Sequence, residues 1–314
     1  MARVVQFEKV GGPEVLEIVE VPTPAPGDGE VLVEVKAAGI NPVDLKLRSG
    51  ERRLPTPTGP WRLGSDAAGV ITAIGDGVTG WAAGDEVIVR GAHGAYATHV
   101  VASAARLTRK PASISWEQAA ALGTPVSTAY QVLTSLGVGE GTTLLLHAGS
   151  GSVGSAAIQF ANAWGATVIA TGSEANQQRM RELGAIPTTY GPGLVDRVRA
   201  LAPGGVDVVL DAAGTDEALE ASFELVPDRS HIGTIVAGAR AADLGIRAWA
   251  GGSPVPLTPE ELATRAEAYG VVADLLERGE FRIDVSRVYP LDEVAAAHRD
   301  IESRAVSGKV ILAP

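Results

Sequence analysis

The sequence of 314 residues contains no cysteine. That absence excludes disulfides, thiolate nucleophiles, iron–sulfur clusters and any zinc site that depends on sulfur ligands. Long apolar runs are absent too, because no stretch reaches the roughly 18 uninterrupted apolar residues of a transmembrane helix. The N-terminal segment carries Arg3, Glu8 and Lys9 and has no apolar stretch of signal-peptide length. These absences predict a soluble, cytoplasmic protein that does not associate with a membrane.

Positive charge is scarce as well. Lys and Arg total 26 against 37 Asp and Glu, so the formal net charge is −11. Because a nucleic-acid-binding surface must be basic, no nucleic-acid partner is expected. Apolar residues make up 46% of the chain, which is enough for a large buried core. At about 150 residues per domain, the length suggests two domains.

The first third of the chain has the pattern of an antiparallel sheet. In residues 1–110, β-branched runs of strand length alternate with turn segments rich in Pro and Gly. Val31, Val33 and Val35 alternate with side chains of the opposite face, as in a half-buried strand. We therefore predict an irregular small barrel in this region.

The pattern becomes helical near residue 113, and strands and helices then alternate. This alternation predicts a doubly wound parallel sheet with right-handed crossovers. The predicted strands are 142–148, 166–171, 206–212, 231–238 and 243–251, and the predicted helices between them are 152–164, 173–183, 195–201 and 216–226. Beyond the sheet we expect helices near 259–278 and 292–303 and a final strand over 308–313.

The strongest chemical signal is a glycine-rich loop between a predicted strand and a predicted helix. Gly149, Gly151 and Gly154 form the pattern G-x-G-x-x-G. In this pattern the glycines permit a tight turn, close approach of the backbone to a pyrophosphate, and close helix–strand packing. The helix N-terminus adds free N–H groups and the positive end of its dipole. The loop predicts a dinucleotide cofactor, with an ordinary turn as the alternative.

The end of the second predicted strand of the parallel sheet distinguishes NADP from NAD. An NAD enzyme usually ends this strand with an acid that holds the ribose 2′-hydroxyl. Here Gly172 and Ser173 follow the strand, and the first acid, Glu174, comes after them. Room is left for a 2′-phosphate, to which Ser173 can donate a hydrogen bond. NADP is therefore the predicted cofactor, while Arg181 is interpreted as part of a solvated helix face.

Six stretches of the chain have a specific order and spacing. They are AAGINPVDLKLRSG, LGSDAAGVITAIGDGVTGWAAGDEVIV, AAALGTPVSTAYQVL, LLLHAGSGSVGSAAIQFANAWGATVIATGS, VDVVLDAAG and IESRAVSGKVILAP. Together they resemble the zinc-independent medium-chain dehydrogenases and reductases of the quinone oxidoreductase (zeta-crystallin-like) group. The resemblance covers essentially the whole chain. It implies an α/β protein with a GroES-like β-barrel catalytic domain (1–123 and 258–314) and a doubly wound Rossmann domain (124–257), with the active site in the cleft.

The resemblance also implies roles for individual residues. Asn41 and Thr128 match positions that line the nicotinamide pocket, and both are expected to act in catalysis. Ser152 and Val153 join the glycine loop in the cradle for the pyrophosphate. The residues that match positions around the adenosine 2′-phosphate are Gly172, Ser173, Tyr190 and Arg304. Asp44 matches an acidic position of the family, and both a structural cap and a catalytic role stay open for it.

The chain departs from the family pattern near the cofactor and the substrate. The usual lysine near the 2′-phosphate is Asn176 here, which weakens selectivity for NADP unless Arg304 or Arg179 compensates. Lys46 and Arg52 replace aromatic residues that some relatives place near the substrate. These two replacements argue against a simple quinone pocket.

A second departure concerns metal binding. The zinc-dependent branch of the superfamily has a Cys or His within the stretch GINPVD and a His-Glu pair where Gly64-Ser65-Asp66 stands here. None of those ligands is present, and the five histidines lack the spacing of metal ligands. No metal is therefore expected, and His147 is interpreted as a packed residue rather than a cofactor contact.

These observations predict an NADPH-dependent oxidoreductase that transfers hydride to a quinone or another conjugated carbonyl without zinc. Two alternatives stay open: a double-bond reductase acting on enones, 2-alkenals or enoyl thioesters, and a non-catalytic, crystallin-like NADPH-binding protein. We also expect a homodimer. The predicted strand 243–251 would leave a long apolar edge that antiparallel pairing across a twofold axis covers, and the family generally dimerises in this way.

Overall fold

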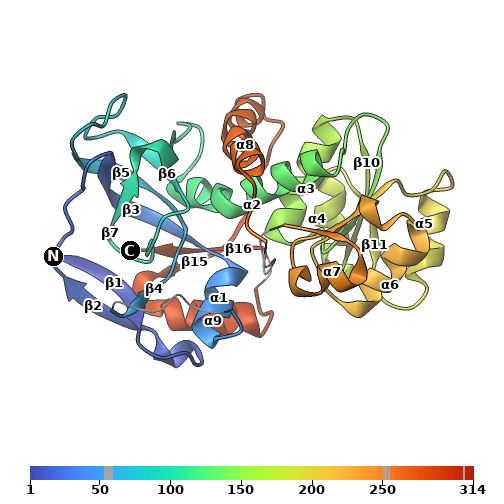
Figure 1. Cartoon of the computed structure of the whole chain (residues 1–314), viewed down its shortest axis with the longest axis horizontal. Helices are drawn as coiled ribbons and strands as arrows, with labels where there is room; N and C mark the ends of the chain where they lie inside the picture. Colours follow the sequence, from blue (N-terminus) through green and yellow to red (C-terminus); the bar gives the residue numbers. More distant parts are fainter. Residues whose placement is uncertain (53–58, 250–252, 254, 307) are drawn as a thin grey trace. The chain divides into compact units, whose positions relative to one another are not determined.

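The structure is a computed structural model that describes residues 1–52, 59–249, 253, 255–306 and 308–314. The chain folds into two compact units, and the first contains both of its ends (Figure 1). The first unit comprises Met1–Thr124 and Ile283–Pro314, and the second Pro125–Arg282. The chain passes from one unit to the other within helix α2 (Trp116–Ser135).

The first unit contains two sheets. In the smaller one, β1 (Ala2–Phe7) pairs antiparallel with β2 (Glu17–Val21) and with β4 (Trp61–Arg62). The larger sheet has seven strands in the order β15-β16-β3-β5-β6-β8, with β7 also paired to β3. These strands are β3 (Glu30–Ile40), β5 (Asp66–Ile74), β6 (Glu86–Arg90), β7 (His99–Ser103), β8 (Leu107–Arg109), β15 (Val285–Pro290) and β16 (Lys309–Ala313). Within this larger sheet, β15 and β16 pair parallel and the other pairs are antiparallel.

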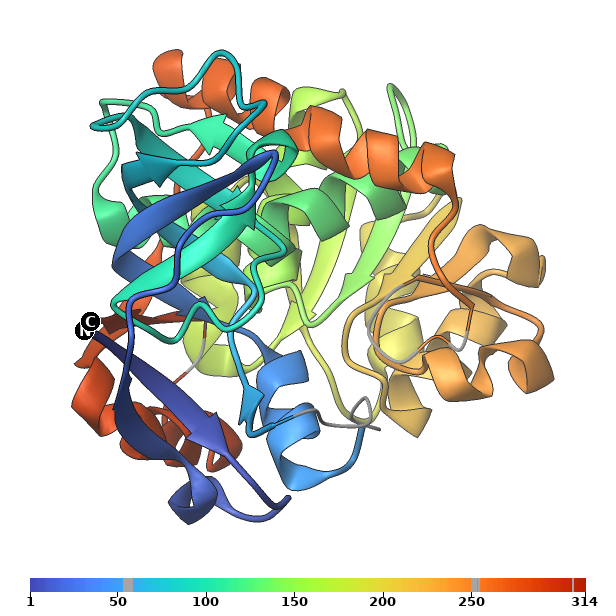
Figure 2. The same ribbon diagram turned by 60° about the vertical axis from the view of Figure 1, so that its left-hand side comes forward.

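The core of the first unit shows most of the alternation expected from the sequence. Val31, Val33 and Val35 of β3 are buried, and Glu34 and Lys36 of the opposite face are half-buried. Leu32, also on that face, is buried as well. The last strand, β16, lies between β15 and β3, so the C-terminal residues complete a sheet begun by the N-terminal ones (Figure 2). Helices α1 (Pro42–Ser49) and α9 (Val294–Glu302) complete the unit.

The second unit is built on a six-stranded sheet that is parallel throughout. Its order is β11-β10-β9-β12-β13-β14, the doubly wound order of dinucleotide-binding folds that the alternation of strands and helices predicts. Helices α3 and α4 cover one face and α5 and α6 the other (Figure 1). The elements are β9 (Thr143–His147), α3 (Ser152–Ala163), β10 (Thr167–Gly172), α4 (Gln177–Glu182), β11 (Ile186–Thr189), α5 (Leu194–Leu201), β12 (Val208–Asp211), α6 (Asp216–Leu225), β13 (Ile232–Thr234), α7 (Ala241–Leu244), β14 (Arg247–Ala248) and α8 (Pro259–Glu277).

Two predicted strands of this sheet are much shorter than the sequence pattern indicates. The predicted strand 231–238 shrinks to β13, because the hydroxyl of Thr234 accepts hydrogen bonds from the next backbone N–H groups and turns the chain. The predicted strand 243–251 contains the two-residue β14, because α7 precedes it and Gly245 turns the chain with φ +70°. Residues 250 and 251 of that prediction lie outside the described residues. Strand β11 is present although the sequence pattern does not predict it.

The second unit extends further along the chain than the resemblance implies. Residues 258–282, which the resemblance assigns to the first domain, group with the second unit. Arg265 on α8 donates a hydrogen bond of 3.4 Å to the Gln131 side chain on α2. Phe281 packs on Phe160 of α3, with ring centroids 5.2 Å apart. These contacts bind the segment to the helices of the parallel sheet.

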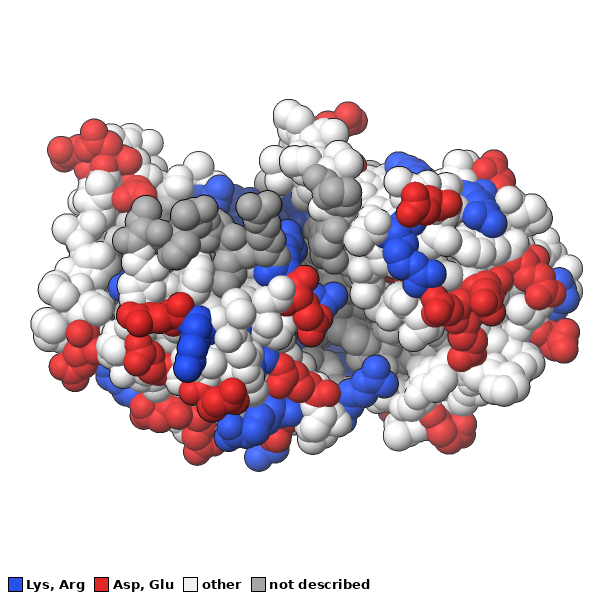
Figure 3. Space-filling view, turned by 60° about the horizontal axis from the view of Figure 1, so that its bottom comes forward, with Lys and Arg blue, Asp and Glu red and all other residues white. Residues whose placement is uncertain are grey.

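The surface carries charges of both signs. On the described part of the face in Figure 3, Lys and Arg side chains are interspersed with Asp and Glu rather than gathered into one field. Among the described helices, none is both long and apolar enough to cross a membrane.

Candidate cofactor and active site

The glycine loop leaves the carboxyl end of β9, and two of its three glycines are required by the protein's own packing. A Cβ on Gly149 would lie 2.7 Å from the Cβ of Ala170, and one on Gly154 would lie 2.5 Å from the carbonyl oxygen of Ala148. Gly151 differs, because its Cβ would meet nothing closer than that same oxygen at 3.4 Å. Packing within the chain therefore does not require a glycine at position 151, and the absence of a side chain there would let a ligand approach the backbone closely.

Helix α3 begins directly after this loop. Gly151 caps the helix without a side chain, and the first turn contains no acidic residue. The N–H groups of the first helical turn, which includes Ser152 and Val153, have no acceptor within the helix. They face outward at the positive end of the helix dipole, which is where phosphates bind in proteins. The loop and this helix therefore fit the pyrophosphate of a dinucleotide.

The end of β10 carries no carboxylate. The strand finishes at Gly172, where a Cβ would lie 2.6 Å from the terminal methyl group of Met180. The hydroxyl of Ser173 accepts a hydrogen bond of 2.9 Å from the side-chain amide of Asn176. Glu174 follows in a short 3₁₀ helix and is exposed. No carboxylate therefore stands at the position where an acid would hold a ribose 2′-hydroxyl.

Tyr190 lies on the neighbouring strand end. β10 and β11 pair in parallel with Gly172 opposite Thr189, so Ser173 and Tyr190 leave the same edge of the sheet side by side. The guanidinium of Arg197 donates to the carbonyl oxygens of Thr189, Tyr190 and Gly191 and holds this loop. The Tyr190 side chain is 59% exposed, which leaves its ring accessible to a ligand.

Arg304 and Thr128 lie elsewhere in the chain. Arg304, in the first unit, follows α9, has φ +58° and is exposed. It makes no side-chain hydrogen bond or ion pair with another described residue, so its guanidinium is available to an anion. Thr128, in the second unit, lies on α2 three residues after Pro125 and is 4% exposed.

His147 ends β9 and is a packed residue, as the sequence analysis predicts. Its two ring nitrogens contact the hydroxyls of Thr171 at 3.3 Å and Ser222 at 3.1 Å. Ser222 already donates its proton to the Ala218 carbonyl, so it accepts from His147, whose Nε2 carries the proton. Burial lowers the pKa of His147 to about 4, although Asp211 and Glu217 act to raise it. The ring is therefore neutral at pH 7.

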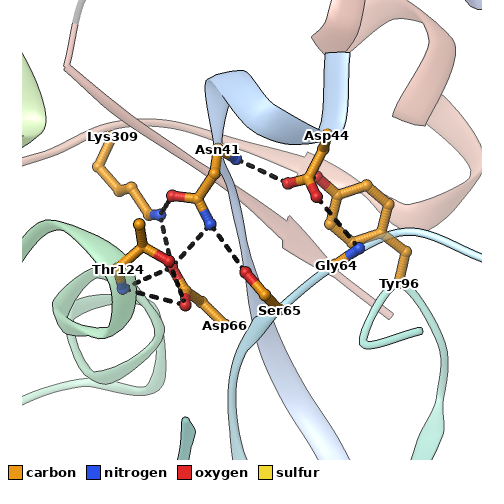
Figure 4. A network of polar contacts seen from close by, with 8 residues as sticks. All are labelled: Asn41, Asp44, Gly64, Ser65, Asp66, Tyr96, Thr124 and Lys309. Carbon is orange, nitrogen blue, oxygen red and sulfur yellow. Dashed lines mark hydrogen bonds and ion pairs between the residues drawn. The ribbon is translucent and has the colours of Figure 1, made fainter. Parts of the chain in front are cut away.

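In the first unit, Asn41 belongs to a closed network of buried polar groups (Figure 4). Its amide oxygen accepts a hydrogen bond of 2.7 Å from the ammonium of Lys309, and its amide nitrogen donates to Asp66 at 2.8 Å. Lys309 and Asp66 form an ion pair of 3.1 Å, with 3% and 2% of their side chains exposed. Both ends of the Asn41 amide are thus satisfied within the chain.

Asp44 acts as a cap for α1. Its carboxylate accepts hydrogen bonds from the Asn41 N–H at 2.9 Å and from the Tyr96 hydroxyl at 2.7 Å, with the Gly64 N–H at 3.4 Å. Burial raises the pKa of Asp44 to about 6, while the hydrogen bond from Tyr96 acts to lower it. Of the two roles left open for Asp44, this geometry supports the structural one.

The residues around Asp66 do not suit a zinc ion. The resemblance places a His-Glu pair of the zinc-dependent branch within the stretch Gly64-Ser65-Asp66, and here the Lys309 ammonium already neutralises the Asp66 carboxylate. Within the described residues, no three His, Cys, Asp or Glu side chains gather in a way that could hold a metal. A fixed cation in contact with Asp66 and Asn41 opposes binding of a second one.

Sequence reasoning assigned no role to Lys309 or Tyr96. Lys309 is the one charged residue of the strand KVILA, and that contrast is the signal from which its pairing could have been suspected. Tyr96 follows a turn segment and has no comparable signal.

Together, the two units define a protein class. A parallel nucleotide-binding unit and an antiparallel unit that contains both chain ends are the architecture of medium-chain dehydrogenases and reductases. The family described as "Alcohol dehydrogenase GroES-like domain" matches residues 27–112, and the family "Zinc-binding dehydrogenase" matches residues 188–312.

Full-length relatives narrow the class. Quinone oxidoreductase 1 of Escherichia coli is 35% identical, as is a quinone oxidoreductase of Pseudomonas aeruginosa, each over 100% of both chains. The chain belongs to the quinone oxidoreductase family of medium-chain dehydrogenases and reductases. Among solved structures, the E. coli quinone oxidoreductase complexed with NADPH matches with a TM-score of 0.85 and 31% identity over 100% of both chains. An NAD-dependent alcohol dehydrogenase matches with a TM-score of 0.83 and 32% identity over 99% of both.

The buried histidines predict acid sensitivity of the fold. His147 stays neutral in the folded chain but is protonated below its usual pKa of about 6.5 once unfolded. Stability is therefore lost as the pH falls from about 6.5 toward 4, and at pH 5 the loss from this group is about 2 kcal/mol. Urea unfolding at pH 7.5 and pH 5 should show this loss in the wild type and a smaller one in His147→Gln.

Two matched variants control this comparison. His298, buried in the first unit with its pKa lowered to about 3 by burial and by Arg48, should behave like His147 when changed to Gln. His93 is exposed, so His93→Gln should leave the pH dependence unchanged. The raised pKa of Asp44 acts in the opposite direction, stabilising the fold as the pH falls through about 6, but it is common to all four proteins and cancels. Equal acid losses in the wild type and in both buried-histidine variants would contradict the assignment.

Proposed function

We propose that the protein is an NADPH-dependent oxidoreductase that reduces a quinone or another conjugated carbonyl compound. The observation that carries the proposal is the pairing of an open phosphate cradle at Gly151 with an uncharged strand end at Gly172 and Ser173. The E. coli and mycobacterial relatives solved with NADPH, at 31% and 30% identity, support the same cofactor.

In this proposal each unit contributes its own residues. Gly149, Gly151, Ser152, Val153 and Gly154 hold the pyrophosphate through backbone N–H groups. The residues proposed to hold the 2′-phosphate are Gly172, Ser173, Tyr190 and Arg304. When bound, NADPH supplies the hydride for the reduction.

The proposed reaction does not require a metal. Charge that develops on a conjugated acceptor is delocalised, so a few fixed hydrogen-bond donors suffice to stabilise it. Asn41 and Thr128 are proposed to set the geometry of the nicotinamide and the acceptor, and orientation of this kind is a large part of such catalysis. Simple alcohols are poor substrates under this proposal, because their oxidation needs a group that lowers the pKa of the hydroxyl.

The acceptor class can be tested directly. NADPH oxidation should be measured at about 340 nm with quinones, enones, 2-alkenals, enoyl thioesters, saturated aldehydes and ketones, each with and without a strong chelator. We expect turnover with quinones and other conjugated carbonyls, unaffected by the chelator.

Other results of this assay would contradict the proposal in different ways. Activity lost on chelation and restored by zinc would contradict the metal-free reaction. Activity confined to saturated carbonyls, or to alcohols with NAD, would move the chain toward the alcohol dehydrogenase relative. Tight NADPH binding with no turnover on any acceptor would favour the crystallin-like alternative.

Cofactor selectivity provides a second test. An arginine–phosphate hydrogen bond contributes about 1.5–3 kcal/mol, equivalent to roughly 10- to 150-fold in affinity. Arg304→Ala should therefore weaken NADPH binding by that factor in a fluorescence titration and leave NADH binding almost unchanged. Arg299→Ala removes another exposed arginine from the end of α9 and should change neither. Equal weakening for both cofactors in Arg304→Ala would contradict the assignment of Arg304.

The proposed assembly is a cytoplasmic homodimer. β14 is the edge strand of the parallel sheet, and pairing across a twofold axis would cover that edge. The described part of the edge is two residues long, so this pairing is less extensive than the sequence pattern suggests. Sedimentation at micromolar concentration should give about twice the chain mass of 32.2 kDa. A single species at the chain mass would contradict the dimer.

A further inference from the structure

The ammonium of Lys309 is buried in the first unit and has a restricted choice of partners. Lys309 is the first residue of β16, and its side chain is 3% exposed. The Lys309 side chain passes close to Gly39. A Cβ on Gly39 would lie 2.7 Å from Lys309 Cε and 2.8 Å from Lys309 Nζ. The absence of a side chain at Gly39 gives the ammonium its place, where it meets Asn41 Oδ1 at 2.7 Å and Asp66 Oδ2 at 3.1 Å.

These two contacts determine which way the Asn41 amide points. An ammonium only donates hydrogen bonds, so it must face the amide oxygen and not the nitrogen. The amide nitrogen is then directed at Asp66 Oδ2, 2.8 Å away, with the Ser65 hydroxyl at 3.4 Å (Figure 4). Without the ammonium, the Asn41 oxygen would lose this donor, and the amide would be held at its nitrogen end alone, by the hydrogen bond to the Asp66 carboxylate.

The same ion pair also holds a segment of α2. The Asp66 carboxylate accepts from the backbone N–H of Thr124 at 3.0 Å and from its hydroxyl at 2.9 Å. Gly123 makes this approach possible, because a Cβ there would collide with the Asp66 carboxyl group. Pro125 follows directly and interrupts the hydrogen bonding of the helix. Lys309 therefore fixes the Asn41 amide directly and this part of α2 through Asp66.

We propose that Lys309 is a positioning residue for hydride transfer, acting through the orientation of the Asn41 amide. The proposal rests on the proposed function, which places Asn41 among the residues that set the nicotinamide geometry. Lys309 touches neither cofactor nor acceptor in this assignment. Its contribution is a fixed charge that holds the oxygen end of the Asn41 amide, while Asp66 holds the nitrogen end.

The test compares Lys309→Met with Asp66→Asn and with the double variant D66N/K309M. Each single change leaves one buried charge unpaired and should lower the melting temperature, whereas the double variant removes both charges and should recover most of the loss. Methionine offers no donor to the Asn41 oxygen, so the amide remains unfixed in the double variant. We expect a kcat for quinone reduction that stays about 10- to 100-fold below the wild type in K309M and in the double variant, with a smaller change in KM.

A readout that does not depend on turnover accompanies the kinetics. NADPH fluorescence reports the surroundings of the bound nicotinamide, and its emission in K309M and D66N/K309M should resemble that in Asn41→Ala. The Kd for NADPH should change by less than about threefold, because the proposed pyrophosphate cradle belongs to the other unit. Lys110→Met is the matched control: Lys110 is also a largely buried lysine of the first unit, paired with Glu86, and its loss should leave kcat and emission unchanged.

The outcomes separate positioning from stability. Recovery of kcat and emission together with the melting temperature in D66N/K309M would show that Lys309 only stabilises the fold and would overturn the proposal. Wild-type kcat and emission in K309M would overturn it too. If the wild type itself reduces no quinone, the proposed function fails. The positioning proposal can still be decided in that case, by comparing the emission of NADPH bound to K309M with its emission when bound to Asn41→Ala.

Discussion

A lysine ammonium buried away from water has to be paired with a negative charge. In the first unit, the pair that meets this requirement also joins segments that are distant in the sequence. Taking one partner of a buried ion pair away typically costs about 3–5 kcal/mol, because the remaining charge is left uncompensated. Here the pair joins the C-terminal strand to β5 and, through hydrogen bonds, to the start of α1 and to α2. Four segments distant in sequence are thus held by one charge interaction, and two glycines, Gly39 and Gly123, provide the space for it.

The second unit builds its site by different means. Its proposed cradle for phosphate consists of backbone N–H groups and the dipole of α3. Glycine stands at the positions where a side chain would collide with the chain or would exclude a ligand. No cation of the second unit has to be buried for this purpose. The polar groups buried nearby, His147, Thr171 and Ser222, satisfy one another instead and keep the end of β9 fixed beside the loop. A neutral histidine performs this task because burial disfavours its charged form.

The two units use different kinds of groups for their proposed roles. Binding of the cofactor phosphates is assigned to groups that need no charged side chain in the cradle itself, so affinity there depends on backbone geometry. Orientation at the reacting end is assigned to a neutral amide whose direction is fixed by charged neighbours behind it. The Asp66 carboxylate, which accepts a hydrogen bond from this amide, is neutralised by Lys309.

The class of fold, the glycine-rich loop and the uncharged end of β10 could be predicted from the sequence, because each depends on local periodicity or on residues a few positions apart. For Asp44, which lies within one helical turn of Asn41, the sequence left both a structural cap and a catalytic role open. It overestimated β13 and β14, because apolar runs continue through residues where Thr234 and Gly245 turn the chain. The three-dimensional fold was needed to show that residues 258–282 group with the second unit and that Lys309 contacts Asn41 and Asp66. Those contacts join residues 243 and 268 positions apart, and no local pattern specifies which buried charges will meet across such distances.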